Sequence, residues 1–321
     1  MGKDYSIGID LGGTNLRVAL VSRDGLVVDR TKVSSSGDLM ASLTSAIQSL
    51  FNSGAGGIGL AVPGLVDAKR QRILRAPNLS ILETIDVSSK LTARFGVPVF
   101  LENDANSAAL GEMYSGAGKE LDTFVLLTLG TGIGGAVIYK RKLLDVAGEL
   151  GHIVVEANGR QCGCGARGCL EAYCSSRAIV EITREAMDSG RPTSLGLLGS
   201  PVELAGATGG CHSLQAITPK IIHEHSLRGD TLATEVLKQA GWYLGIGIAN
   251  YINVFSPEAV VLTGGLTGAW DVYVKEAIRS ASERAFKTLF QKAGIIRGIH
   301  GDNAGVIGAA SMAFLQGSVE S

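Results

Sequence analysis

A dense group of potential metal ligands lies near the middle of the sequence. His152 is followed by Cys162, Cys164 and Cys169, and glycines separate the cysteines. One imidazole and three thiolates complete a closed tetrahedral Zn²⁺ site, and the glycines allow the loop to curl around an ion. Disulfides are the alternative, but Cys162 and Cys164 are too close along the chain to pair easily with each other. The pattern therefore favours a structural zinc site.

Two glutamates bracket residues 152–169, which we call the zinc loop. Glu149 precedes His152 by three residues, and Glu171 follows Cys169 by two. Most glutamates are surface charges, which is the competing interpretation. A rigid zinc loop would nevertheless hold two carboxylates and an imidazole around one spot, where they could accept hydrogen bonds from several hydroxyl groups. Such a set indicates a sugar ligand. The remaining Cys174 and Cys211 are predicted to be small core residues.

Two glycine-rich segments have the composition of phosphate-binding turns. The first turn spans residues 10–15 (Asp-Leu-Gly-Gly-Thr-Asn) and the second spans residues 130–135 (Gly-Thr-Gly-Ile-Gly-Gly). Glycines let backbone N–H groups approach oxyanions, and Asp10 can hold a hydrated Mg²⁺. One such segment is more often a plain tight turn, but two at equivalent points of a repeat favour phosphate binding. A third pair, Gly264 and Gly265, ends a strand and fits either a ligand site or an ordinary β-to-α turn.

Asp104 is the candidate general base. It follows Glu102 and Asn103 after an apolar strand and opens a predicted helix, so its carboxylate lies at the positive end of that helix. Asp and Asn are also favoured helix caps, and capping alone is the alternative. Phosphoryl transfer to a hydroxyl needs one carboxylate that accepts the proton while Mg²⁺ and backbone dipoles neutralise the phosphates. Asp104 is placed to be that carboxylate.

Alternating strand and helix signals predict an α/β fold. Strands are expected over residues 7–9, 17–21, 26–33, 58–62, 97–101 and 259–263, the first three as a meander. Helices are expected over residues 38–50, 88–95, 104–114, 175–189, 231–255, 271–293 and 303–316. Residues 125–130 match residues 7–12 at an offset of 118, which predicts an internal duplication. The ligand would then bind in the cleft where the two turns face each other.

Composition excludes several classes of protein. The 321 residues include 44 glycines but only 7 prolines without a collagen period, and 45% are hydrophobic against 18% charged, so the chain is expected to be globular. The net charge is −1 and no basic cluster exceeds residues 140–142, which argues against nucleic acid as a partner. No signal-peptide pattern opens the sequence, so a cytoplasmic location is predicted. The uncharged stretch 240–257 is predicted to be a buried helix and not a membrane span.

Four segments together resemble the ROK family of bacterial sugar kinases and repressors. They are residues 10–14, 102–104 and 148–152, and the Cys-x-Cys-Gly-x-x-Gly-Cys-x-Glu run of residues 162–171. The resemblance covers nearly the whole chain and implies a duplicated actin-like ATPase (ribonuclease H-like) fold with two domains that close on the sugar. The smaller domain would comprise residues 1–115 with the C-terminal helix 303–321, and the larger one residues 116–302. A homodimer or homotetramer is implied.

The resemblance also implies roles for individual residues. Asp104 would be the general base toward the sugar 6-hydroxyl, and His152 would bind zinc through one ring nitrogen and sugar through the other. Sugar would be bound by Gly64, Asn78, Asn103, Asp104, Glu149, His152 and Glu171. ATP and Mg²⁺ would be bound by Asp10, Gly12, Gly13, Thr14, Asn15, Gly130, Thr131, Gly132, Gly134, Gly264 and Gly265. Structural Zn²⁺ would be bound by His152, Cys162, Cys164 and Cys169.

The implied activity is ATP-dependent phosphorylation of a hexose, with glucose as the first expectation. N-acetylmannosamine, N-acetylglucosamine, fructose and allose are alternative substrates within the family. A sugar-responsive repressor is the alternative of another class, but such proteins carry a DNA-binding helix-turn-helix, and only residues 1–5 precede the first predicted strand. The chain departs from many glucokinase-like members at residues 80–84, where those members carry a Trp. Its segment 191–211 is also longer than usual, so the sugar rim is the least defined part of the prediction.

Overall fold

The computed structural model describes residues 4–12, 15–35, 37–51, 54–67, 69–76, 79–195 and 217–316. The chain forms two compact units, the first comprising Met1–Leu127, Gly135–Gly148 and Ile296–Ser321 and the second Thr128–Gly134 and Glu149–Ile295. This division differs from the predicted boundary because residues 116–127, 135–148 and 296–302 group with the first unit. Residues 143–147, for example, line one cavity with residues of segments 64–74 and 102–106.

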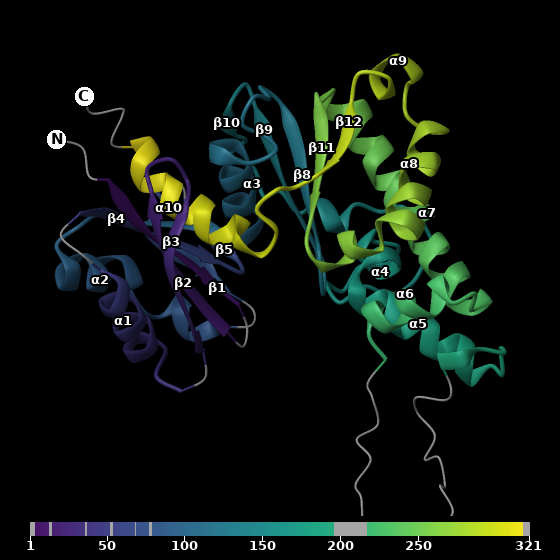
Figure 1. Cartoon of the computed structure of the whole chain (residues 1–321), viewed down its shortest axis with the longest axis horizontal. Helices are drawn as coiled ribbons and strands as arrows, with labels where there is room; N and C mark the ends of the chain where they lie inside the picture. Colours follow the sequence, from purple (N-terminus) through teal and green to yellow (C-terminus); the bar gives the residue numbers. More distant parts are fainter. Residues whose placement is uncertain are drawn as a thin grey trace, which may run out of the picture. The chain divides into compact units, whose positions relative to one another are not determined.

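The first unit is built on a mixed five-stranded sheet with the order β3-β2-β1-β4-β7 (Figure 1). Its strands are β1 (Tyr5–Leu11), β2 (Asn15–Ser22), β3 (Val27–Ser34), β4 (Ala55–Val62) and β7 (Val99–Asn103). Strand β2 pairs antiparallel with both β1 and β3, which confirms the predicted meander. Strands β4 and β7 continue the sheet in parallel with β1. The short strands β5 (Leu65–Val66) and β6 (Ile73–Arg75) form a separate hairpin that the sequence did not reveal.

Helices cover both faces of this sheet. They are α1 (Leu39–Leu50), the 3₁₀ turn η1 (Ser80–Glu83), α2 (Val87–Phe95), α3 (Asp104–Ser115), η6 (Gly301–Asn303) and α10 (Ala304–Gln316). Ile7 and Ile9 share one core cluster with the buried residues of α1, whereas Gly8 faces α10. A Cβ at Gly8 would lie 1.8 Å from the backbone oxygen of Val306, so glycine is needed for α10 to pack this closely on β1.

The second five-stranded sheet has the order β10-β9-β8-β11-β12. Its strands are β8 (Phe124–Leu129), β9 (Ile133–Tyr139), β10 (Lys142–Leu143), β11 (Ala259–Thr263) and β12 (Gly294–Arg297). Strand β8 takes the place of β1, β9 that of β2, and the remaining strands follow in the same order. This correspondence confirms the duplication inferred from the 118-residue offset.

The second unit contains most of the remaining helices. They are η2 (Leu150–His152), α4 (Glu171–Cys174), α5 (Ser176–Asp188), α6 (Pro219–Leu227), α7 (Thr231–Phe255), η4 (Gly265–Ala269), the π turn η5 (Trp270–Val274), α8 (Lys275–Ser282) and α9 (Lys287–Phe290). Helix α7 has the predicted bounds, and it buries Leu244, Ile248 and Ile252 from the uncharged stretch, as expected. No helix in the described part of the chain combines the length and apolar character that crossing a membrane requires.

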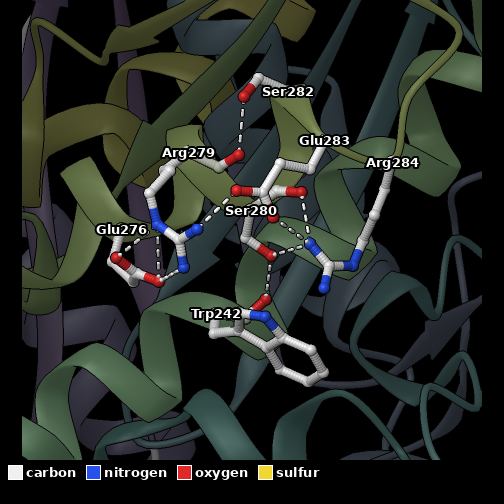
Figure 2. Close-up of polar contacts among 7 residues, drawn as sticks. All are labelled: Trp242, Glu276, Arg279, Ser280, Ser282, Glu283 and Arg284. Carbon is white, nitrogen blue, oxygen red and sulfur yellow. Dashed lines mark hydrogen bonds and ion pairs between the residues drawn. The ribbon is translucent and has the colours of Figure 1, made fainter.

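The single helix predicted over residues 271–293 is wrong, because the chain forms η5, α8 and α9 there. Figure 2 shows the polar contacts around the end of α8, including those of Arg284. Near the end of α8, the Arg284 guanidinium donates to the backbone oxygen of Ser280 at 2.8 Å and lies 4.6 Å from the centre of the Trp242 ring. The Asn253 side chain on α7 then accepts the backbone N–H of Phe286 at 2.8 Å. These bonds offer the backbone partners outside the helix, so the chain turns before α9.

Candidate active site

The four predicted zinc ligands converge in the second unit. Nδ1 of His152 lies 3.7 Å from Sγ of Cys162, and Sγ of Cys164 lies 3.7 Å from Sγ of Cys169. All four ligand atoms lie within 4.8 Å of one another. Tetrahedral Zn–S bonds of about 2.3 Å separate two sulfurs by about 3.8 Å, whereas a disulfide requires about 2.05 Å. The donor set therefore fits one tetrahedral zinc ion, and the described cysteines are free thiols.

Backbone turns give the zinc loop its shape. Cys162 donates its N–H to the oxygen of Ala166 at 2.8 Å, and Gly165 donates back to Cys162 at 3.0 Å. Gly168 adopts a φ of +75°, and a Cβ there would lie 1.8 Å from the oxygen of Glu156, so the loop needs glycine at this position. Burial raises the pKa of the Cys169 thiol to about 12 in the absence of a metal. A bound cation would favour the ionised form, in which this sulfur acts as a ligand.

The predicted sugar ligands Glu149 and His152 lie close together at the start of the zinc loop. Oε2 of Glu149 lies 4.0 Å from Nε2 of His152, and 61% of the Glu149 side chain is exposed. Because Nδ1 of the same imidazole faces Cys162, the two ring nitrogens have different neighbours, as the predicted double role of His152 requires.

Glu171 makes contacts that the sequence did not reveal. Only 13% of its side chain is exposed. Its Oε2 accepts the backbone N–H of Ile133 at 2.9 Å, and its Oε1 accepts a hydrogen bond from Nη2 of Arg177 at 3.2 Å. A Cβ at Gly132 would lie 2.4 Å from Oε2 of Glu171, so this carboxylate explains the glycine. The predicted sugar ligand therefore also holds the second turn.

Hydrogen bonds within the second turn limit which of its N–H groups can meet a ligand. Gly130 donates to the oxygen of Gly132 at 3.0 Å, and Gly134 donates to Oγ1 of Thr128 at 3.1 Å. Ile133 is bound to Glu171. Among the described residues, no acceptor is seen for the N–H groups of Thr131 and Gly132. Their N–H groups are therefore the donors that this turn can offer to a ligand, and phosphate binding stays a prediction.

The first turn begins at the end of β1. Gly12 donates to the oxygen of Asn15 at 2.9 Å and so closes the turn. Asp10 lies 3.7 Å from Nη1 of Arg17, and burial raises the pKa of Asp10 although Arg17 opposes the shift. A divalent cation at this carboxylate would favour its ionised form. The predicted ligands Gly13, Thr14 and Asn78 lie outside the described residues.

Asn103, and not Asp104, caps helix α3. Oδ1 of Asn103 accepts the N–H groups of Ala105 and Asn106 at 2.9 and 3.1 Å, and its Nδ2 donates to the oxygen of Gly64 at 3.0 Å. Asp104 is exposed and occupies the first position of the helix, where its Oδ1 also accepts the N–H of Ala105 at 2.9 Å. The capping alternative for Asp104 is therefore wrong, whereas the base role stays a prediction.

The profile of the ROK family matches residues 6–315 of this chain. The protein belongs to the ROK family. It is similar to a glucokinase from Thermotoga maritima, with 33% identity over 97% of this chain and 98% of that glucokinase. It is also similar to the xylose repressor of Bacillus subtilis, with 30% identity over 96% of this chain and 76% of the repressor. A solved ROK family glucokinase from Streptomyces griseus, in complex with glucose and AMPPNP, matches with a TM-score of 0.79 and 30% identity over 97% of this chain and 99% of that one.

These matches confirm the predicted fold class. ROK sugar kinases have the actin-like ATPase fold with two domains, and the two sheets of this ROK protein repeat one strand order. Gly264 follows β11 with a φ of +92°, and a Cβ there would lie 2.5 Å from the oxygen of Leu129. Packing against β8 therefore explains this glycine, while Gly265 has open space beside its Cα. The adenosine role of this pair stays a prediction.

A buried carboxylate beside Asn103 was missed by the sequence argument. Glu102 is 6% exposed, and its Oε2 lies 2.8 Å from Nη1 of Arg70. Its Oε1 accepts the N–H of Asn103 and the Nδ2 group of Asn106, both at 2.9 Å. These groups line a cavity of about 420 Å³ in the first unit of this ROK protein, together with Gly64. Glu102 thus holds the backbone that carries Asn103 and Asp104. The sequence of residues 102–104 does not indicate this role.

Proposed function

We propose that this protein is an ATP-dependent hexokinase that transfers the γ-phosphoryl group of ATP to the 6-hydroxyl of glucose. The observation that carries the proposal is the placement of Asp104 at the start of α3, where Asn103 is the N-cap and accepts the N–H groups of Ala105 and Asn106. Asp104 is exposed there and is not required as the cap. Similarity to glucokinases over nearly the whole chain supports glucose as the acceptor.

In the proposed reaction, Asp104 acts as the general base. Its carboxylate accepts the proton of the 6-hydroxyl while that oxygen forms a bond to the γ-phosphorus and the bond to the ADP oxygen breaks. The positive end of α3 favours the ionised carboxylate. General-base action of this kind contributes roughly 10²–10⁴-fold to the rate, and orientation and charge stabilisation supply the rest.

The two turns would bind the nucleotide. The N–H groups of Thr131 and Gly132 are the donors that the second turn offers to phosphate oxygens. The first turn would contribute Gly12 to Asn15, and Asp10 would hold Mg²⁺ through water. Mg²⁺, when bound with ATP, neutralises the charge that develops on the phosphates. Gly264 and Gly265 would lie near adenosine.

The zinc loop would order the sugar site. His152 and the three cysteines supply four protein ligands, so zinc would have a structural role and would not activate water. Glu149, His152 and Glu171 would accept or donate hydrogen bonds with sugar hydroxyls, together with Gly64, Asn78 and Asn103 from the first unit. The Nδ2 group of Asn103 already donates to Gly64, so one N–H of that amide is left for a sugar.

A sugar panel in a coupled ADP-release assay tests this proposal. Glucose is expected to give the highest kcat/KM, with N-acetylmannosamine, N-acetylglucosamine and fructose as the competing acceptors. Absence of ADP release with every hexose would overturn the proposal. The match to a xylose repressor motivates a second assay, a gel shift with genomic fragments, in which specific binding would favour the repressor function. The cytoplasmic location and the homodimer or homotetramer stay predictions.

A further inference from the structure

The carboxylate of Glu171 joins two parts of the second unit that are far apart in sequence. It accepts the backbone N–H of Ile133 at 2.9 Å from a position 38 residues later in the chain. The same carboxylate oxygen also lies against Gly132, where a Cβ would come within 2.4 Å of it. The second turn and Glu171 are therefore fitted to each other by both hydrogen bonding and shape.

Neighbouring bonds fix the carboxylate and the other end of the turn. Arg177 Nη2 lies 3.2 Å from Oε1 of Glu171. The same Nη2 would lie 3.0 Å from a Cβ at Gly163, so the guanidinium also lies against the zinc loop. Ser176, at the start of α5, donates its N–H to the oxygen of Gly130 at 2.8 Å. The turn is thus held at Gly130 and at Ile133 by one short segment that follows the zinc loop.

The two N–H groups left for phosphate lie between these fixed points. Thr131 and Gly132 lie between Gly130 and Ile133, and no described residue accepts their N–H groups. The orientation of these two N–H groups therefore depends on the hydrogen bonds that hold Gly130 and Ile133. Donors that are held in place before a ligand arrives bind more tightly, because less conformational entropy is lost on binding.

We propose that Glu171 is a positioning residue for the nucleotide, in addition to its proposed role in sugar binding. Its hydrogen bond to Ile133 holds the second turn in the conformation that presents the Thr131 and Gly132 N–H groups to phosphate. The inference rests on the proposed kinase function. It predicts that nucleotide affinity depends on Glu171 even when no sugar is present.

The test is calorimetric binding of Mg-ADP without sugar to the full-length wild type and to two variants. Glu171→Ala removes the acceptor for Ile133 and is expected to weaken ADP binding about tenfold, the equivalent of one hydrogen bond. Glu171→Gln keeps an acceptor oxygen but removes the charge, and is expected to stay within about threefold of wild type. If repulsion between carboxylate and phosphate were the dominant effect, both variants would bind ADP more tightly, and the proposal would be wrong.

Two further measurements separate positioning from general damage. Glu185→Ala removes a carboxylate that pairs with Arg160 of the zinc loop at 2.6 Å, and it should leave ADP affinity unchanged because it does not touch the turn. Hydrogen exchange at the Ile133 amide reports the anchor directly and should accelerate in Glu171→Ala but not in Glu185→Ala. Unchanged exchange in Glu171→Ala would overturn the proposal. Protection of Ile133 in a wild type that fails to bind ADP would instead contradict the kinase function.

Discussion

The side-chain amide of Asn103 donates to the backbone oxygen of Gly64 at 3.0 Å and so links the loop after β4 to the start of α3. The same side chain caps α3 through Ala105 and Asn106. One residue thereby sets both the helix that carries Asp104 and the loop that carries Gly64. A Cβ at Gly64 would lie 2.0 Å from the oxygen of Arg75, so the loop has little freedom to adjust.

Substitutions of Asn103 should separate these two bonds. Asn103→Ala loses the cap and is expected to destabilise the protein by about 1 kcal/mol and to lower kcat, because α3 then frays beside Asp104. Asn103→Asp keeps an oxygen for the cap but cannot donate to Gly64. It should retain the melting temperature more fully than Asn103→Ala while raising the KM for sugar. Equal melting temperatures for Asn103→Ala and wild type would contradict the capping role.

Asp104→Asn should impair chemistry without loss of stability. Asn103 supplies the cap, and Asn at position 104 keeps an oxygen for the Ala105 N–H, so the substitution removes only the negative charge. The kcat is expected to fall by roughly 10²–10⁴-fold. The melting temperature and the affinity for ADP should stay near wild type. Thermal unfolding and steady-state kinetics on the same preparation check this prediction. A variant that retains near-normal turnover would exclude Asp104 as the base.

The features that the sequence predicted best are those encoded by residues close together along the chain. The predicted zinc ligands Cys162, Cys164 and Cys169 lie within eight consecutive positions, and their thiols converge as the sequence predicts. The bounds of α7 follow from its long apolar repeat between Asp230 and the turn at Ser256. The two glycine-rich turns could be recognised because the duplication repeats them.

What the sequence did not reveal depends on partners distant along the chain. The break after α8 requires Asn253, which lies 33 residues before the Phe286 amide that it accepts. The bond from Ile133 to Glu171 likewise has no local signal, so the sequence could not show that the Glu171 carboxylate is a further reason for glycine at position 132. Such contacts follow from the folded topology and not from spacing along the sequence.

Metal analysis should find one zinc per chain in protein purified without chelator. Removal of the metal leaves a buried Cys169 thiol with a pKa near 12, and the zinc loop is no longer cross-linked by an ion. The melting temperature should therefore fall, and sugar affinity should be lost. Cys164→Ser should lose zinc. Cys174→Ala is the matched control, because Cys174 is a buried thiol outside the ligand group and its replacement should retain the metal. Full metal-free stability would refute a structural site.

Asp230 predicts a specific response of stability to acid. It caps α7 through the N–H of Ala233 at 2.9 Å and accepts further hydrogen bonds from Thr193 and Ser194 at 2.6–2.8 Å. Burial raises the pKa of this carboxyl, but the hydrogen bonds from Ala233, Ser194 and Thr193 outweigh that effect and hold the pKa at about 2. The value in an unfolded chain is about 3.9.

Because the pKa is lower in the folded state, the carboxylate contributes stability that is fully present above pH ~4 and is lost as the pH falls toward 2. At pH 6, Asp230→Ala should therefore unfold at a lower urea concentration than wild type, and its free energy of unfolding should be lower by about 1–2 kcal/mol. This difference in the free energy of unfolding should become smaller at pH 3, where the unfolded wild type takes up a proton at Asp230. Asp230→Asn keeps an acceptor for Ala233, so it should lose less stability, and its difference from Asp230→Ala should not change with pH. A constant gap between wild type and Asp230→Ala from pH 6 to pH 3 would show that the hydrogen bonds do not favour the ionised form.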